Sequence, residues 1–182
     1  MKIEDLIKSC INNNRKAQEE LYHLYKNTLF AVSLKYCRNQ AEAEDNLHNA
    51  FIEIFTNIKN YKWKGSFEGW MKRITINTAI DSYKKSYQLI PIKDSYDSTE
   101  IEEEEIEMHS SEFILSLVQE LPNQYRLVFC LYELDQYSHT EIAKMLSIST
   151  STSKSNLHRA KQILKEKIKS TNTIPNTVTY GK

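Results

Sequence analysis

Helical periodicity is the sequence feature that most limits what this chain can fold into. Apolar side chains recur at intervals of three and four residues along most of the chain, which places them on one face of an α-helix. The strongest example comprises Ala43, Leu47, Ala50, Phe51, Ile54, Phe55 and Ile58. The 182 residues include only three glycines and three prolines, which argues against folds with many tight turns. We therefore predict an all-α protein.

The periodic segments form two groups. In the first group we predict helices near residues 3–11, 16–37, 43–58 and 67–87, which can pack as a small bundle. We expect Leu24 to lie on the buried face of the second of these helices. In the second group the periodic segments cover residues 111–121, 125–134, 138–146 and 150–169. The sequence thus predicts two small helical domains.

Charge separates the two groups, although the overall balance is neutral. Residues 1–85 contain 14 Lys and Arg against 10 Asp and Glu, residues 86–120 contain 1 against 10, and residues 121–182 contain 9 against 4. Two basic modules, each able to attract phosphates, flank an acidic connector. We predict domains at 1–87 and 111–170, a flexible acidic linker at 88–110 and a disordered tail at 171–182. The run Glu102 to Glu105 also leads to a hypothesis: without polymerase, the linker folds back on the basic modules and competes with DNA. The alternative is a solvated tether.

The segment from Asn60 to Trp70 combines both tryptophans with lysines and two of the three glycines. Aromatic rings among lysines are suited to stacking on unpaired bases while neutralising phosphates. The alternative is that the rings fill the core where two helices meet. That alternative fits Phe67 and Trp70 better than Tyr61 and Trp63, because the latter two stand beside lysines in a segment without helical periodicity.

The second group contains the sequence pattern of a helix-turn-helix. Ser138 and Glu141 are spaced as a capping box, and a short turn at 147–149 separates that helix from one beginning at Thr150. The second helix of such a motif places its first residues in the major groove, and basic residues farther along contact phosphates. The candidate DNA-contacting residues are Thr150, Ser151, Thr152, Lys154, Ser155, His158 and Arg159.

No pattern in the sequence indicates an enzyme, a metal site or a cofactor. Cys10, Cys37 and Cys130 are far apart and lie mostly in apolar helical patterns, so we predict reduced core thiols. His139, Thr140 and Glu141 match only half of the zinc-deaminase signature. The sequence shows neither an apolar run long enough to span a membrane nor a signal-peptide pattern, and we predict a cytoplasmic protein without membrane insertion.

Three motifs in the first module resemble region 2 of the sigma-70 family, most of all its small extracytoplasmic-function (ECF) members. The motifs are Ala43 to Phe51, Gly65 to Ile74, and the pair Asn77 and Asp81. The resemblance implies that the helix after residue 40 binds core RNA polymerase through Glu44, Asp45, His48, Asn49 and Glu53. Glu44 and Asp45 also suit a helix amino terminus for electrostatic reasons alone. The family usually has Gln in place of His48 and an acidic residue in place of Asn49.

The same resemblance implies that the aromatic segment and the following helix capture the promoter −10 strand. In the family a base of the non-template strand is flipped into a pocket of the loop. The corresponding residues here are Lys62, Trp63, Lys64, Gly65 and Ser66 in the loop and Arg73, Asn77, Asp81 and Lys84 on the helix. We expect Asn77 to read a base edge, although an exposed asparagine on a helix needs no such role.

The second module resembles sigma region 4, which binds the −35 element and the flap of the polymerase. The motifs are Leu121 to Phe129, Glu141 to Ala143, and Lys154 to Ala160. Relatives commonly have Gly-Thr-Val-Lys-Ser-Arg where this chain has Ser151 to Asn156, so we expect modest DNA affinity from the isolated module. The two resemblances imply an ECF sigma factor whose partners are core RNA polymerase, promoter DNA and an anti-sigma factor.

Two other classes of protein remain open from the residues alone. A stand-alone helix-turn-helix regulator would use only the second module and would leave the aromatic segment without a role. A helical adaptor would bind proteins and no DNA. DNA binding with and without core polymerase distinguishes the three, because a sigma factor becomes promoter-specific only in the holoenzyme.

Overall fold

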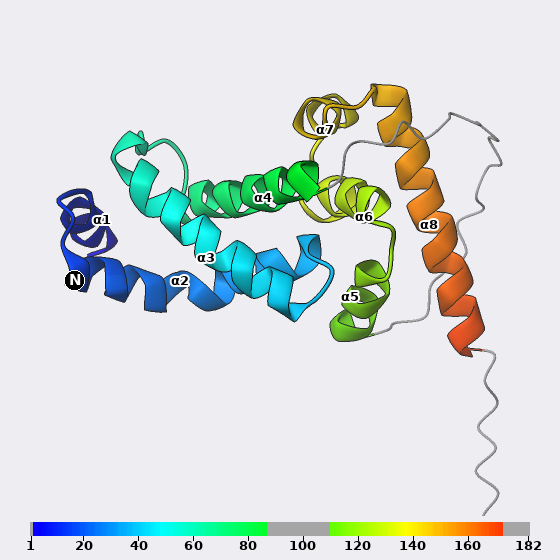
Figure 1. Ribbon diagram of the computed structural model, residues 1–182, viewed down its shortest axis with the longest axis horizontal. Helices are drawn as coiled ribbons and strands as arrows, with labels where there is room; N and C mark the ends of the chain where they lie inside the picture. The colour runs from blue at the N-terminus through cyan, green and yellow to red at the C-terminus, as the bar shows by residue number, and fades with distance from the viewer. Residues whose placement is uncertain (1, 87–109, 173–182) are drawn as a thin grey trace, which may run out of the picture. The chain divides into compact units, whose positions relative to one another are not determined.

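The computed structural model describes residues 2–86 and 110–172, and every regular element in these two ranges is a helix (Figure 1). The chain divides into two compact units, Met1–Pro91 and Ile92–Lys182, which we describe separately. The predicted all-α class is confirmed. The predicted linker lies outside the described residues except for its last residue, and the predicted tail except for its first two. The hypothesis about Glu102 to Glu105 also concerns residues outside the described ranges. Within the described ranges no helix is long and apolar enough to cross a membrane.

Unit 1 contains all four helices that the periodicity predicts, with ends shifted by up to three residues. They are α1 (Ile3–Ile11), α2 (Arg15–Tyr36), α3 (Gln40–Asn57) and α4 (Phe67–Ser86), and a short 3-10 turn, η1 (Ile58–Asn60), follows α3. Asparagines begin two of the helices, because the side-chain oxygen of Asn14 accepts a hydrogen bond from the Ala17 amide and that of Asn39 from the Glu42 amide.

The core of unit 1 lies where α2, α3 and α4 pack against one another, and α1 covers one part of α2 (Figure 1). Leu21 and Leu29 of α2, Ile54 of α3 and Met71 of α4 are fully buried there. The predicted burial of Leu24 is wrong, since its side chain is 58% exposed. A residue on the border of an apolar stripe is covered only if a neighbouring helix reaches it, and the period alone does not decide this.

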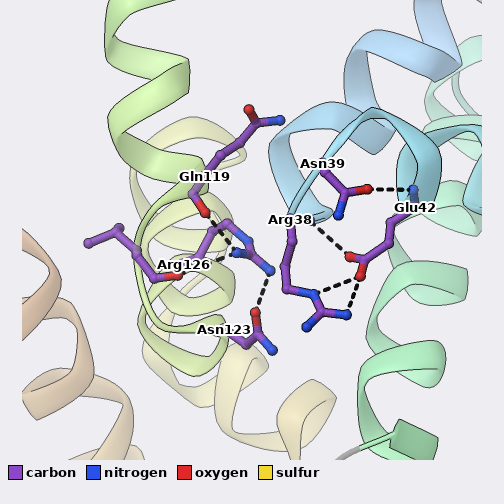
Figure 2. Close-up of polar contacts among 7 residues, drawn as sticks. Arg38, Asn39, Glu42, Gln119, Asn123 and Arg126 are labelled. Carbon is purple, nitrogen blue, oxygen red and sulfur yellow. Dashed lines mark hydrogen bonds and ion pairs between the residues drawn. The ribbon is translucent and has the colours of Figure 1, made fainter.

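The junction between α2 and α3 is fixed by polar contacts (Figure 2). The Glu42 carboxylate forms an ion pair with the Arg38 guanidinium and accepts a hydrogen bond from the Arg38 backbone amide at 3.0 Å. Asn39 caps α3 in the same turn. These contacts lie in the short connection between the two helices and satisfy one of the first amides of α3.

Unit 2 contains α5 (Ser111–Gln119), α6 (Asn123–Phe129), the π-helical turn η2 (Cys130–Leu134), α7 (His139–Leu146) and α8 (Thr150–Asn172). The helix that the sequence predicts over 125–134 is present as α6 followed directly by η2, because Phe129 and Cys130 at their junction both have helical backbones. The last helix ends at Asn172, two residues beyond the predicted domain end. The core of unit 2 includes Leu127, Leu131, Ile142, Leu146 and Ala160.

Arg126 is a buried structural residue of unit 2 to which the sequence assigned no role. Its guanidinium donates hydrogen bonds to the carbonyl oxygens of Gln119 at 3.2 Å and Leu121 at 3.3 Å (Figure 2). It also donates to the Asn123 side chain at 2.8 Å. A cation beside carbonyls at the end of α5 is favourable, because those groups carry the negative end of the helix dipole. Arg126 thus joins α5 to α6.

The three cysteines are buried thiols, as predicted. Burial, and next the nearby Glu20 carboxylate, raise the pKa of Cys10 to about 11. The Cys10 thiol is therefore protonated and unreactive at neutral pH.

Candidate nucleic-acid interface

The polar face of α3 carries the five residues that the sequence assigns to polymerase binding. Glu44, Asp45, His48, Asn49 and Glu53 are all exposed, while Leu47 and Phe51 face the core. The Glu44 carboxylate accepts a hydrogen bond from the Gln40 side chain at 2.8 Å. His48 contacts the Glu44 carbonyl oxygen through Nδ1 at 3.0 Å. The five residues share an exposed face of α3 with Ile52, whose apolar side chain is 63% exposed, and their contact with polymerase stays a prediction.

Tyr61 belongs to the core and is not a free stacking platform, contrary to the preference drawn from its sequence neighbours. Its side chain is 8% exposed, and its ring centroid lies 5.1 Å from that of Phe67 and 5.5 Å from that of Trp70. Its hydroxyl donates a hydrogen bond to the Gly65 carbonyl oxygen at 2.9 Å. Tyr61 therefore anchors the loop from inside, because the loop turns back over the start of α4.

Trp63 is the exposed aromatic residue of this loop. Its side chain is 46% exposed, with the ring centroid 5.3 Å from that of Tyr61. Trp63 has a left-handed backbone, with φ of 57°, and Gly65 has φ of 77°, a conformation that glycine adopts at little cost. Lys62, Lys64 and Ser66 are exposed in the same loop. The loop thus exposes the Trp63 indole between two lysines. The indole packs against Tyr61, which in turn contacts Trp70.

The four α4 residues of the predicted −10 site are spaced so that they share one side of the helix. Arg73, Asn77 and Asp81 are exposed at four-residue intervals, and Lys84 is partly buried. Residues spaced by three or four lie on one face of a helix. The α4 residues of the predicted −10 site therefore form one line beyond the loop.

A groove between α3 and α4 joins the two predicted sites of unit 1. Its volume is about 570 Å³. Asn49 and Glu53 line it from α3, and Asn77 and Asp81 line it from α4. The other lining residues are Ile52, Asn57, Asn60, Trp70, Ile74, Thr78, Ser82 and Lys85. The sequence missed this arrangement, since nothing in a helical repeat indicates which faces of two helices border the same groove.

The helix-turn-helix of unit 2 is built as its sequence predicts. The Ser138 backbone amide and hydroxyl both donate to the Glu141 carboxylate, at 2.9 and 2.8 Å, and the Glu141 amide donates back to the Ser138 hydroxyl at 3.3 Å. The capping box is therefore confirmed. Ser147 ends α7 with φ of 58°. The chain then turns and enters α8.

The start of α8 presents a cluster of hydroxyl groups. The Ser149 hydroxyl accepts a hydrogen bond from the Thr152 amide at 2.9 Å and lies 2.7 Å from the hydroxyls of Ser151 and Thr152. Thr150, Ser151 and Lys154 are exposed, and the other four predicted DNA contacts are partly buried: Thr152, Ser155, His158 and Arg159. The structure therefore places all seven residues along the first three turns of α8.

Two buried polar residues of α8 were not predicted. Ser153 is fully buried and contacts Nδ1 of His139, at the start of α7, at 2.9 Å. The His139 ring stacks on Tyr132, with centroids 4.4 Å apart. Burial, and next the positive charge of Lys154, lower the pKa of His139. Asn156 is also buried, and its Nδ2 has no hydrogen-bond partner.

Some basic residues of α8 are engaged within unit 2. Lys161 forms an ion pair with Glu133 at 2.7 Å, and Lys167 forms one with Glu120. Both pairs are partly exposed, so they add little stability. They reduce the positive charge that α8 offers to DNA beyond its first turns.

Comparison with known families identifies both units. The family model for sigma-70 region 2 matches residues 21–88, and the model for sigma-70 region 4 matches residues 112–164. Together they cover about two thirds of the chain, in the expected order. The chain belongs to the sigma-70 family. Every candidate site residue named above falls inside one of the two matched regions.

Within the sigma-70 family the chain is similar to ECF members. It is 26% identical over 183 residues to the ECF RNA polymerase sigma factor SigW of Bacillus subtilis, covering 93% of this chain and 98% of the relative. It is 27% identical over 155 residues to the ECF RNA polymerase sigma factor SigE of Mycolicibacterium smegmatis, covering 81% of this chain but only 60% of that relative. These similarities place the chain in the ECF group.

A solved structure supports the sigma-70 fold. The sigma factor RpoE, crystallised in complex with the anti-sigma factor NepR from Bartonella quintana, matches with a TM-score of 0.53 and 16% identity. The match covers 83% of this chain and 96% of the RpoE chain. At this identity the comparison concerns the fold, and it agrees with two helical domains.

Proposed function

We propose that this protein is an ECF-type sigma factor that directs core RNA polymerase to specific promoters. The observation that carries the proposal is the occurrence of two separate polar surfaces on units matched by two different sigma regions. A regulator that binds only duplex DNA has no use for the first unit. As a sigma factor, this protein acts in the cytoplasm. It contributes binding and strand capture and catalyses no reaction of its own.

Polymerase binding is assigned to the exposed face of α3. Glu44, Asp45 and Glu53 supply negative charge, and His48 and Asn49 supply further hydrogen-bonding groups. The apolar side of the same helix is buried, so these groups are held on a rigid support. Binding of α3 to polymerase brings α4 and the aromatic loop to the promoter, because all three belong to one packed unit.

Capture of the −10 strand is assigned to the loop and to α4. Flipping a base out of a duplex costs a few kcal/mol, and stacking on an aromatic side chain returns about 1–3 kcal/mol per base. Trp63 offers an exposed indole for this contact, and Lys62 and Lys64 stand beside it for phosphates. Asn77 can pair with a base edge through its amide, since asparagine matches the donor and acceptor pattern of adenine. Arg73 and Lys84 add positive charge along α4.

Binding of the −35 duplex is assigned to the start of α8. Thr150, Ser151 and Ser155 offer hydroxyls to base edges, and Lys154 and Arg159 offer positive charge. Phosphate contacts give affinity that falls with salt, and few cations stand in the first turns. The isolated protein should therefore bind duplex DNA weakly and depend on polymerase for promoter binding.

An anti-sigma factor is the expected regulatory partner. RpoE, a structural relative, was crystallised with the anti-sigma factor NepR. By analogy, a partner of this kind would cover the polymerase-binding or DNA-binding surfaces of the present chain until it is released.

In vitro transcription tests the proposal. The protein is mixed with sigma-free core polymerase of its own organism and a pool of genomic promoter fragments, and transcript starts are mapped. We expect starts that share two elements at a fixed spacing and that disappear when Asn77 and Lys154 are both replaced by alanine. The control replaces Lys16 and Asn27, exposed residues of α2, by alanine and should leave the starts unchanged.

The other classes of protein give different results in this assay. Sequence-specific duplex binding without polymerase, and no starts with it, would indicate a stand-alone regulator. Binding to neither DNA nor polymerase would indicate an adaptor. Either result would reject the sigma-factor proposal.

A further inference from the structure

Asn46 places a polar amide inside the apolar core of unit 1. It lies in the middle of α3 and is only 4% exposed. Its Nδ2 donates hydrogen bonds to the Ser33 hydroxyl of α2 at 2.9 Å and to the Thr75 carbonyl oxygen of α4 at 3.2 Å. The Ser33 hydroxyl donates in turn to the Leu29 carbonyl oxygen at 3.0 Å. One side chain thus connects the three main helices of the unit.

Stability alone does not account for an amide at this position. Its Oδ1 is buried without a hydrogen-bond partner, and an unpaired buried acceptor is unfavourable. An apolar side chain of similar volume would avoid that cost and the cost of removing the amide from water. Such a replacement leaves the Ser33 hydroxyl paired, because it still donates to the Leu29 carbonyl oxygen.

What the amide supplies is direction. Apolar contacts between helices are not directional and tolerate small shifts along the interface. A hydrogen bond from α3 to a backbone carbonyl of α4 is directional and restricts both sliding and rotation. Asn46 stands one helical turn before Asn49, and Thr75 stands two residues before Asn77. The bond therefore joins the two helices near the level at which their side chains line the groove.

From this geometry we propose that Asn46 is a positioning residue for capture of the −10 strand. It fixes the register of α4 against α3, and with it the spacing between the polymerase-binding face and the DNA-reading face. In enzymes, a misplacement of about 1 Å can cost a factor of about 100 in rate, and strand capture also requires several groups at fixed positions. This inference rests on the proposed function, because strand capture is the step that the register serves.

The test compares Asn46→Leu with Ser33→Ala in the complete holoenzyme. Asn46→Leu removes the bond to α4, whereas Ser33→Ala keeps the donor and the Thr75 carbonyl and removes only the contact to α2. Three quantities are measured for each variant. They are the urea midpoint of unfolding of the free protein, its affinity for core polymerase, and the rate at which the holoenzyme opens a promoter fragment that the wild-type protein uses. Promoter binding before opening is measured separately with the same fragment.

We expect Asn46→Leu to keep the unfolding midpoint or raise it and to leave polymerase affinity and initial promoter binding unchanged. Its strand-opening rate should fall by about tenfold, since the register of α4 is lost while the −35 contacts of unit 2 remain. Ser33→Ala should open DNA at the wild-type rate. A stable protein with slower opening separates positioning from structural support.

Other outcomes overturn the inference. If Asn46→Leu opens DNA as fast as the wild type, the register does not depend on the amide. If the unfolding midpoint and all activities fall together, in this variant and in Asn46→Ala, the amide is a structural residue only. If the wild-type protein produces no starts, the proposed function fails first, and the two failures are thereby distinguished.

Discussion

The two helices assigned to DNA binding, α4 and α8, form their sites in different ways. Helix α4 is packed between α2 and α3, and its site combines a loop, an aromatic cluster and a groove shared with α3. The α8 site consists of the first turns of one helix, where hydroxyls are linked to one another. Single-strand capture requires a pocket and stacking surfaces from several segments, whereas a duplex groove accepts one helix end. The first site therefore depends on tertiary packing and the second mainly on local sequence.

The largest expected effect concerns the packing beneath the α4 site. Met71 is fully buried, so Met71→Ala should lower the free energy of unfolding of unit 1 by about 2–5 kcal/mol. Both tryptophans belong to unit 1, so urea unfolding followed by tryptophan fluorescence reports on that unit. The matched change in unit 2 is Leu146→Ala, which should not move this transition. An equal shift from Leu146→Ala would show that the units unfold together.

The next effect concerns the exposed ring of the loop. Trp63→Ala should weaken capture of an unpaired base by about 1–3 kcal/mol, because a stacking surface is lost. Stability should fall by about 0.5–1.5 kcal/mol, because the ring also packs against that of Tyr61. Strand opening, followed by 2-aminopurine fluorescence in the −10 element, measures the effect. Trp63→Tyr keeps an aromatic ring and should retain most of the activity; an unimpaired Trp63→Ala protein would exclude the indole from strand capture.

A smaller effect is expected in unit 2, where the helix start is local. Ser138→Ala removes the capping box of α7 and should lower stability by about 1 kcal/mol. Thermal unfolding followed by circular dichroism at the helix band measures the loss. Thr140→Ala, exposed in the same turn, is the control and should have little effect. Equal losses from both variants would mean that the cap contributes nothing beyond helix propensity.

The smallest effect is a pH dependence in the contact between α7 and α8. The pKa of His139 is lowered in the folded protein, so the folded state binds this proton less readily than the unfolded state. The stability that His139 contributes is therefore complete above its unfolded pKa of about 6.5 and falls as the pH drops through that value. Unfolding measured between about pH 7.5 and pH 5.5 should show a flatter profile for His139→Gln. Identical slopes in both proteins would remove His139 from the pH dependence.

Much of the fold could be predicted because the signals for helices, their apolar faces and their caps lie within a few residues of one another in the sequence. The stripe on α3 and the cap at Ser138 depend on residues three and four positions apart, and the structure confirms both. The α8 residues predicted to contact DNA were chosen from the same short-range order, and the structure places them along the first turns of that helix. Family motifs then identify the units, since the models match the regions in which the motifs were found.

The parts that could not be predicted depend on contacts between segments distant in sequence. Tyr61 turned out to be buried because the loop folds back on Trp70, and Leu24 turned out to be exposed because no helix of the described residues covers it. Asn46 and Thr75 are 29 positions apart, and their bond exists only because α3 and α4 cross at that level.

The sequence by itself determined that this protein is helical, that it has two modules and that it resembles sigma regions 2 and 4. Helical periodicity, capping residues and charge distribution are short-range properties that a linear pattern contains. Only the tertiary structure decided which polar residues lie in the core and that the α3 and α4 sites share one groove. Those facts depend on the angle and register at which helices pack, and many sequences with the same periodicity are compatible with different registers.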